Sequence, residues 1–225
     1  KNLRDIYSGY TQHFGAIIPE NKDVEIIDYG CGSGNLLCWL DSLGYKNIRG
    51  VDGSPEQIAL ANEKVKNVVK IADVFDEIIS SSANNERFDV IFCVDLLEHF
   101  ESKDAYRFIE HCFDILNDGG LLIIQVPNAE SPFFGALRYG DFTHELAFTE
   151  SSIRQVFLSI GFSFVGVHSW RPSITSRKSI LRYLAWRIIE FLIKLPIRIE
   201  SGKADPIVTK NIVSVGYKEV LEIKR

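Results

Sequence analysis

Short apolar runs alternate with amphipathic stretches through the first 127 residues. The runs have the length and the continuous hydrophobicity of strands that are buried on both faces of a parallel sheet. They lie at 24–29, 47–52, 68–72, 88–95 and 121–126. Helical patterns at 35–43 and 102–116 lie between them, and Ser54 followed by Pro55 predicts a further helix start. This alternation predicts βαβ units with right-handed crossovers.

Two stretches of this half are predicted to be irregular. Residues 80–87 read as a polar surface loop, and 118–120 read as the turn that ends the helix at 102–116. The pattern changes after residue 127. Residues 128–148 are rich in Gly, Pro, aromatic and charged side chains without a clear period, which predicts a long ordered loop, and such loops often carry function.

The remainder of the chain predicts the edge of the sheet. A helix at 151–160 is followed by strands at 162–170 and 207–217, which we expect to be antiparallel. We therefore predict one α/β domain over 1–225, with a Rossmann-like, doubly wound, mostly parallel seven-stranded sheet. Its cofactor-binding half is 24–127, 128–148 is an insertion on the acceptor side, and 176–200 is an amphipathic helical element.

The helix predicted at 176–195 is apolar on two sides. One face carries Leu181, Leu184, Ala185, Ile188, Leu192 and Leu195, and a second strip carries Trp186, Ile189 and Ile193. Charged residues lie between the strips, namely Arg187, Glu190 and Lys194. Two interpretations remain open: packing on the sheet together with a lid or homodimer contact, or a basic helix in peripheral contact with an anionic membrane.

Composition narrows the function classes. The chain has 225 residues, 46% of them hydrophobic, and a net charge of −5, which disfavours a nucleic-acid partner. Four cysteines without ligand or disulfide spacing indicate a reducing, cytoplasmic setting, or the inner face of a membrane. The first 15 residues do not have the pattern of a signal peptide. Because methionine is absent, we expect the sequence to be part of a longer gene product.

Glycines follow the first predicted strand in the stretch Asp28-Tyr29-Gly30-Cys31-Gly32-Ser33-Gly34. Such a turn lets the backbone approach a ligand, and the helix that follows is expected to point free N–H groups at it. Dinucleotide enzymes need the spacing G-x-G-x-x-G, whereas Asn35 stands where their last glycine would be. The Asp28 carboxylate would repel a pyrophosphate and attract an ammonium group, which disfavours an NAD-dependent oxidoreductase.

Acidic residues at the ends of the next strands suit a nucleoside. Asp52 can accept from two ribose hydroxyls, and Asp73 from an adenine amino group that Val74 would cover. The stretches DYGCGSGNLL, GVDGSP, IADVF, FDVIFCVDLLEHF and LNDGGLLIIQVP resemble the class I S-adenosylmethionine (SAM)-dependent methyltransferases in order and spacing. The resemblance spans roughly residues 24 to 170.

The resemblance implies SAM as cofactor and S-adenosylhomocysteine as product. It places Asp28, Gly30, Gly32 and Gly34 at the methionine moiety, Asp52 at the ribose, and Asp73 and Val74 at the adenine. Asp95 and Leu96 would line the cofactor through backbone groups. Cys31 and Gly53 complete the predicted cofactor-binding set.

An alcohol acceptor needs a base or a metal, because its proton must leave as the new bond forms. Residues 126–157 resemble methyltransferases of surface-polysaccharide and O-antigen biosynthesis. That likeness implies that Arg138, Tyr139, Asp141, His144 and Glu145 lie near the acceptor. His144 is our first candidate for the base, oriented by Asp141 or Glu145, and His99 is the second. No ligand spacing indicates a metal, so none is expected.

These observations predict a SAM-dependent O-methyltransferase acting on a sugar hydroxyl in a polysaccharide or its precursor. Two alternatives stay open. The first is O-methylation of a quinone or phenol type of small molecule, which the DLLEH stretch at 95–99 also resembles. The second is a non-catalytic SAM-binding scaffold.

Overall fold

The computed structural model describes residues 3–65, 69–203 and 205–219. It contains a seven-stranded sheet in the order β3-β2-β1-β4-β5-β7-β6, in which β7 alone runs antiparallel to its neighbours. The strands are β1 (Glu25–Tyr29), β2 (Asn47–Asp52), β3 (Val69–Ile71), β4 (Phe88–Val94), β5 (Leu116–Pro127), β6 (Phe164–Ser169) and β7 (Asn211–Tyr217). The predicted mixed sheet with an antiparallel edge is confirmed.

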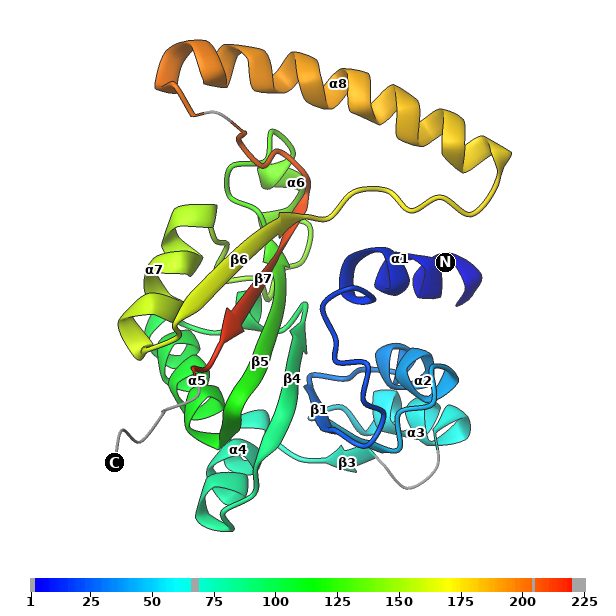
Figure 1. Ribbon diagram of the computed structural model, residues 1–225, viewed down its shortest axis with the longest axis vertical. Helices are drawn as coiled ribbons and strands as arrows, with labels where there is room; N and C mark the ends of the chain where they lie inside the picture. The colour runs from blue at the N-terminus through cyan, green and yellow to red at the C-terminus, as the bar shows by residue number, and fades with distance from the viewer. Residues whose placement is uncertain (1–2, 66–68, 204, 220–225) are drawn as a thin grey trace.

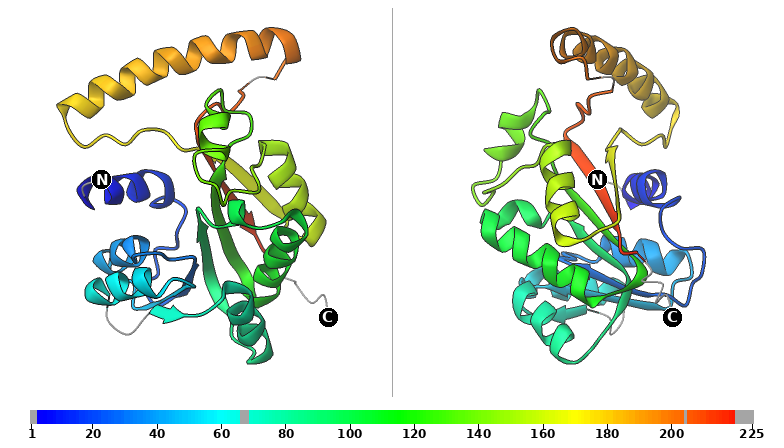
Figure 2. Two further views of the ribbon diagram at one scale, coloured as in Figure 1. Left: turned by 180° about the vertical axis from the view of Figure 1, so that it is seen from behind. Right: turned by 60° about the vertical axis from the view of Figure 1, so that its left-hand side comes forward.

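Helices cover both faces of the sheet, as Figures 1 and 2 show. One face carries α1 (Leu3–Phe14), α2 (Asn35–Ser42) and α3 (Pro55–Lys64), and the other carries α4 (Val74–Ala83), α5 (Ser102–Ile115) and α7 (Glu150–Ile160). The short helices η1 (Leu97–His99) and α6 (Phe134–Arg138) follow β4 and β5. The last helix, α8 (Arg177–Ser201), lies outside both layers, beyond the carboxyl end of β4.

The central strands are buried on both sides, which explains their uninterrupted hydrophobicity. Val90, Ile91, Phe92 and Cys93 of β4 are all fully buried. Because successive side chains of a strand point to opposite faces, Ile91 packs into the core beneath α4, α5 and α7, and Phe92 into the core beneath α1 and α2. The strand order reverses between β1 and β4, and open α/β sheets bind ligands at that point.

Several helix ends carry the local signals read from the sequence. The Ser54 hydroxyl caps α3 by accepting from the Gln57 N–H at 3.3 Å, and Pro55 opens the helix. Gly161 ends α7 with a φ of 125°. In α8, Ser176 and Ser179 form a reciprocal capping box, and Gly202 ends the helix with a φ of 69°.

Other predicted boundaries differ from the structure. Residues 118–120 do not form a separate turn after the helix. Helix α5 ends at Ile115 and is followed directly by β5, which includes these residues. The loop predicted at 80–87 is shorter, since α4 extends to Ala83, and α1 was not predicted as a helix. Residues 128–148 contain α6, and α8 continues through Pro196 to Ser201 instead of ending at 195. The third strand was expected to begin at Val68, which lies outside the described residues.

Candidate functional site

The glycine turn after β1 gives each glycine a separate role. A Cβ atom on Gly30 would lie 3.0 Å from Leu96 Cδ1, and one on Gly34 would lie 3.0 Å from Ala61 Cβ, so these two positions are closed by packing. A Cβ on Gly32 would meet only Gln57 Oε1, at 3.9 Å, although its φ is +50°. Gly32 is therefore the glycine of this turn that leaves open space for a ligand.

Four backbone N–H groups of the glycine turn have acceptors within the protein. Those of Gly30 and Cys31 donate to the Val51 carbonyl at 2.8 and 3.0 Å, and that of Gly34 donates to the Cys31 carbonyl. The N–H of Gly32 donates to Asp52 Oδ2 at 2.8 Å. Cys31 is 8% exposed and its side chain belongs to the core cluster, so its predicted contact with the cofactor stays a prediction. Gly32 therefore contributes open space to the cofactor site, whereas its own N–H group already has an acceptor. The free N–H groups expected at the start of α2 stay a prediction.

The two acidic residues at this edge retain acceptor capacity. Asp28 is 2% exposed, and its Oδ1 has no hydrogen-bond partner among the described residues. Burial, and then the charge of Asp52, raise the pKa of the Asp28 carboxyl well above its ordinary value. Asp52 Oδ1 accepts from the Ser54 N–H at 2.8 Å, which leaves lone pairs on a carboxylate that has about four acceptor sites. The Asp28 and Asp52 carboxylates therefore fit the ammonium and ribose groups of SAM.

The predicted adenine residues have structural roles. Asp73 Oδ1 caps α4 by accepting from the N–H groups of Phe75 and Asp76 at 2.8 and 3.3 Å. Val74 is 9% exposed and packs in the core, so little of its side chain remains to cover a ring. A Cβ atom on Gly53 would lie 3.9 Å from the carbonyl oxygen of Ala72, so this glycine leaves open space beside the end of β3. The adenine contacts stay a prediction.

Asp95 occupies a strained position at the end of β4. Its φ is +54°, in the left-handed region that few residues with a side chain adopt, although aspartate does so more readily than most. Its Oδ1 accepts from Gln125 Nε2 at 2.7 Å and from Asn211 Nδ2 at 3.2 Å, and its N–H donates to the Gln125 carbonyl. The contact of Leu96 with Gly30 places this segment directly against the glycine turn.

Two histidines from separate segments meet beyond β4. The rings of His99 and His144 have centroids 4.9 Å apart. His144 Nδ1 lies 2.9 Å from the Leu137 carbonyl oxygen, which can only accept, so Nδ1 carries the proton and Nε2 holds the lone pair. His99 Nδ1 lies 2.9 Å from Thr143 Oγ1, and the Thr143 hydroxyl donates to Asp141 Oδ1 at 2.7 Å. This chain likewise leaves Nε2 of His99 as the acceptor.

The expected partners of His144 are therefore corrected. Asp141 acts on His99, through Thr143, and does not orient His144. Glu145 faces Arg138, with 3.7 Å between Oε2 and Nη2, and Arg138 also donates to the His144 carbonyl. Tyr139 is 78% exposed. Arg138 and Glu145 hold the loop, whereas the Leu137 carbonyl fixes the His144 ring.

Sequence reasoning noted the Glu98-His99 pair as a candidate cluster but gave Glu98 no role of its own. Its side chain is 2% exposed, and its Oε2 has no partner among the described residues. Burial, and then the charge of Asp95, raise the pKa of Glu98 to about 8. Ligand atoms of Glu98, His99 and His144 all lie within 4.8 Å of one another, an arrangement that could hold a metal ion. Spacing along the sequence did not indicate it, because His144 comes from a different segment.

A cavity of about 810 Å³ lies next to this site. It is bounded by α1, the ends of β4 and β5, α6, α8 and the residues that precede and begin β7. Asp95 and Leu137 line it and connect it to the histidine pair. Gln125 and Trp186 line it, and their Oε1 and Nε1 atoms are buried without partners among the described residues.

Comparison with known proteins decides the family. A model of the family described as "Methyltransferase domain" matches residues 2–167. The chain belongs to this methyltransferase family. SAM, the expected cofactor, is confirmed for the family, and the Asp28 and Asp52 carboxylates and the open face of Gly32 fit it.

The match to individual proteins of known function is at low sequence identity and covers about half of this chain. The chain is 33% identical over 127 residues to the small RNA 2'-O-methyltransferase of Arabidopsis thaliana, over 50% of the chain and 13% of that protein. It is 29% identical over 127 residues to the ubiquinone biosynthesis O-methyltransferase of Rickettsia canadensis, over 56% of the chain and 50% of that protein. The match thus spans half or less of each relative.

The fold has close counterparts among solved structures. A SAM-dependent methyltransferase from Archaeoglobus fulgidus superposes with a TM-score of 0.72 at 17% identity, over 96% of this chain and 94% of that one. The magnesium protoporphyrin IX methyltransferase of Synechocystis, solved with bound SAM, gives a TM-score of 0.56 at 16% identity, over 97% and 85% of the two chains. At these identities the likeness extends to the methyltransferase fold.

Proposed function

We propose that the protein transfers the methyl group of SAM to a hydroxyl oxygen of a small molecule. The observation that carries the proposal is the pair of imidazoles whose Nδ1 atoms are both engaged, so that both Nε2 atoms can accept a proton. They lie beside the segment that contacts the glycine turn. SAM supplies an activated methyl group. The protein must position the hydroxyl and remove its proton, and His144 or His99 serves as the base.

The cavity wall supports a hydroxyl-bearing acceptor. Gln125 Oε1 can accept from a hydroxyl, and Trp186 Nε1 can donate to one. The aromatic rings of Tyr10 and Trp170 also line the cavity and offer flat apolar surface to a ring. Both a sugar and a phenol present such features. The relatives named above bring no support for the saccharide, which remains our prediction alongside the phenol or quinone alternative.

The experiment that tests this proposal has two steps. Calorimetric titration with S-adenosylhomocysteine, with NAD as control, measures cofactor binding. Transfer of labelled methyl from SAM is then measured on nucleotide sugars, glycan ends and catechol-type phenols. Methylation of an oxygen in either acceptor class supports the proposal, whereas binding without transfer to any hydroxyl would favour the scaffold alternative.

A divalent cation at Glu98, His99 and His144 is a second means of activating the same hydroxyl. The buried Glu98 oxygen without a partner among the described residues favours it, since a cation would offset the cost of burying that carboxylate. Two imidazoles and one carboxylate suit a transition metal, which would supply Lewis-acid polarisation of the hydroxyl. Dialysis against EDTA distinguishes activation of the hydroxyl by a bound cation from activation by a histidine base. Loss of activity that Mn²⁺ or Zn²⁺ restores indicates the cation, and unchanged activity indicates the histidine base alone.

A further inference from the structure

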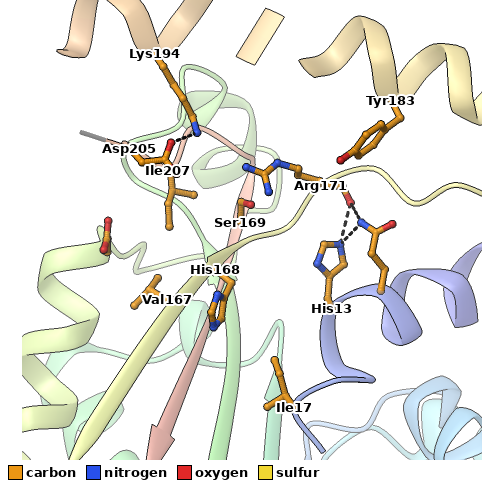
Figure 3. A pocket seen from close by; sticks show the side chains of 12 residues that line it. His13, Ile17, Val167, His168, Ser169, Arg171, Tyr183, Lys194, Asp205 and Ile207 are labelled. Carbon is orange, nitrogen blue, oxygen red and sulfur yellow. Dashed lines mark hydrogen bonds and ion pairs between the residues drawn. The ribbon is translucent and has the colours of Figure 1, made fainter. Parts of the chain in front are cut away.

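Helix α8 is inverted relative to an ordinary surface helix. Its side that faces the body of the protein carries two buried charged side chains beside the partly buried Trp186 and Ile193, and its outer side is apolar. Glu190 and Lys194 have side chains that are only 3% and 8% exposed. Figure 3 shows Lys194 reaching from the helix toward Asp205, with Tyr183 on the same side above Arg171.

Ion pairs fix the inner side of α8. Arg171, on the segment after β6, makes two hydrogen bonds to the Glu190 carboxylate, at 3.1 and 2.9 Å. Lys194 Nζ lies 3.0 Å from Glu190 Oε1 and 2.6 Å from Asp205 Oδ1. The segment that carries Arg171 is held against α1, where Thr175 Oγ1 donates to Asp5 Oδ1 at 2.7 Å. This network determines which side of α8 points outward.

The outer side is a continuous apolar stripe, which we call the α8 stripe. Its side chains recur every three or four residues and are between 43% and 77% exposed. They are Ile180, Leu181, Leu184, Ile188, Phe191, Leu192, Leu195 and Ile199. Single exposed apolar residues are ordinary, but a contiguous patch of this extent marks an interaction surface.

Charge identifies the occupant of this surface. Helical spacing places Lys178 and Arg182 along one flank of the stripe. Arg187 and Arg198 lie along the other flank, where they also pair with Glu190 at 3.8 Å and Asp205 at 3.6 Å. Glu200 is the one acidic residue of the helix outside the buried network. Basic side chains on both flanks of an apolar face suit a surface of anionic lipid headgroups over acyl chains.

We propose that the α8 stripe docks the protein onto an anionic lipid bilayer, with α8 parallel to the membrane plane. Among the described residues, no helix combines the length and hydropathy needed to span a bilayer. Arg182 and Trp186 of α8 also line the cavity of about 810 Å³. Docking through the stripe therefore brings that cavity to about one helix diameter, roughly 10 Å, from the lipid surface. The proposal does not depend on methyl transfer.

Co-sedimentation of the full chain with lipid vesicles tests the proposal. We expect binding to vesicles of phosphatidylcholine with phosphatidylglycerol, weaker binding to phosphatidylcholine alone, and release as salt is raised. The triple variant Leu184→Ser, Ile188→Ser, Leu192→Ser should lower the partition coefficient by about 100-fold or more, because three large apolar side chains no longer enter the lipid. These side chains are exposed, so the fold should persist, which circular dichroism checks.

A matched control removes aliphatic side chains of similar exposure from other helices. Leu60→Ser, Ile79→Ser, Leu158→Ser alters residues that are 46%, 49% and 51% exposed on α3, α4 and α7, and should bind vesicles as the wild type does. Absence of vesicle binding by the wild type, or equal binding by both triple variants, overturns the proposal. So does sedimentation that shows a dimer which the α8 variant alone dissociates, because a second copy would then cover the stripe.

Discussion

The His144 ring packs edge-on against that of His99, with an angle of 71° between the ring planes and 4.9 Å between the centroids. Each ring is held through Nδ1 by a different device, a backbone carbonyl for His144 and a threonine–aspartate chain for His99. Fixing Nδ1 selects the tautomer in which Nε2 can accept a proton. The loop thus orients two candidate bases whose Nε2 atoms are both available.

Loss of the first candidate base should reduce turnover and spare cofactor binding. His144→Ala removes the Nε2 acceptor, so kcat should fall by roughly 100-fold or more, the usual scale for a general base. Affinity for S-adenosylhomocysteine, measured by calorimetry, should not change, since His144 is predicted on the acceptor side and is not part of the predicted cofactor-binding set. His111→Ala on α5 is the matched control and should keep full activity. Unchanged turnover in His144→Ala would remove this residue from the mechanism.

The sequence allowed most of the fold to be predicted, because the strands of a doubly wound sheet are buried on both faces and read as apolar runs. It did not show the inversion of α8. Helical periodicity groups Glu190 with Lys194 but cannot reveal that Arg171 and Asp205 lie under them. A charged face is usually the solvated one, and here tertiary ion pairs bury it.

The candidate site, too, could be predicted from the sequence only in part. Asp28, Gly32 and Asp52 are local to strand ends, so their shared edge followed from topology. The grouping of Glu98 with His144 depends on hydrogen bonds from the Glu145 and Leu146 N–H groups to the Glu98 carbonyl. Such a contact between loops leaves no repeating pattern in the sequence. The sequence therefore identified the candidate residues but not which of them lie together.

Substitution of Gly32 should abolish ligand binding, whereas the same substitution at Gly44, which also has a positive φ, should not. Gly32→Val and Gly44→Val both place a branched side chain at positive φ, +50° and +87°, and at neither position does a Cβ meet protein atoms closer than 3.9 Å. Each should lose about 1–3 kcal/mol of stability from backbone strain. Only Gly32→Val should abolish binding of S-adenosylhomocysteine in calorimetry. Equal affinities in the two variants would show that the open space at Gly32 is not the cofactor site.

Asp28 should make the stability of the cofactor-free protein depend on pH. Its carboxyl has a pKa well above the ordinary value, because burial and the charge of Asp52 disfavour ionisation. A raised pKa in the folded state means that stability is fully present below the unfolded value of about 4 and is lost as pH rises from there toward the folded value. Asp28→Asn does not titrate, so its free energy of unfolding should exceed that of the wild type increasingly above about pH 4.

The same variant should bind the cofactor product less tightly. The amide that replaces the Asp28 carboxylate presents no negative charge to the ammonium group, and loss of a charged hydrogen bond corresponds to roughly 10- to 100-fold in affinity. Urea unfolding at several pH values and calorimetry with S-adenosylhomocysteine measure the two effects. A more stable variant that binds as tightly as the wild type would show that Asp28 does not contact the ammonium group.

Glu190 should control the attachment of α8. Burial opposes its ionisation, but hydrogen bonds from Arg171 and Lys194 outweigh this effect and lower the pKa of Glu190 below its ordinary value. A lowered pKa in the folded state gives stability above the unfolded value that is lost as pH falls through the folded one, so α8 should loosen below about pH 4. Glu190→Gln should loosen it at neutral pH, because the half-buried Arg171 and the buried Lys194 lose their shared counter-charge.

Breaking a buried ion pair from one side costs about 3 kcal/mol, which corresponds to roughly 100-fold faster hydrogen exchange of the α8 amides in Glu190→Gln. Exchange in the central strands should stay as in the wild type, because α8 lies outside both helical layers (Figure 1). Glu200→Gln removes an exposed carboxylate from the same helix and serves as the control. If α8 amides exchange equally in the two variants, the Glu190 network does not hold the helix, and the outward direction of its apolar side must have another cause.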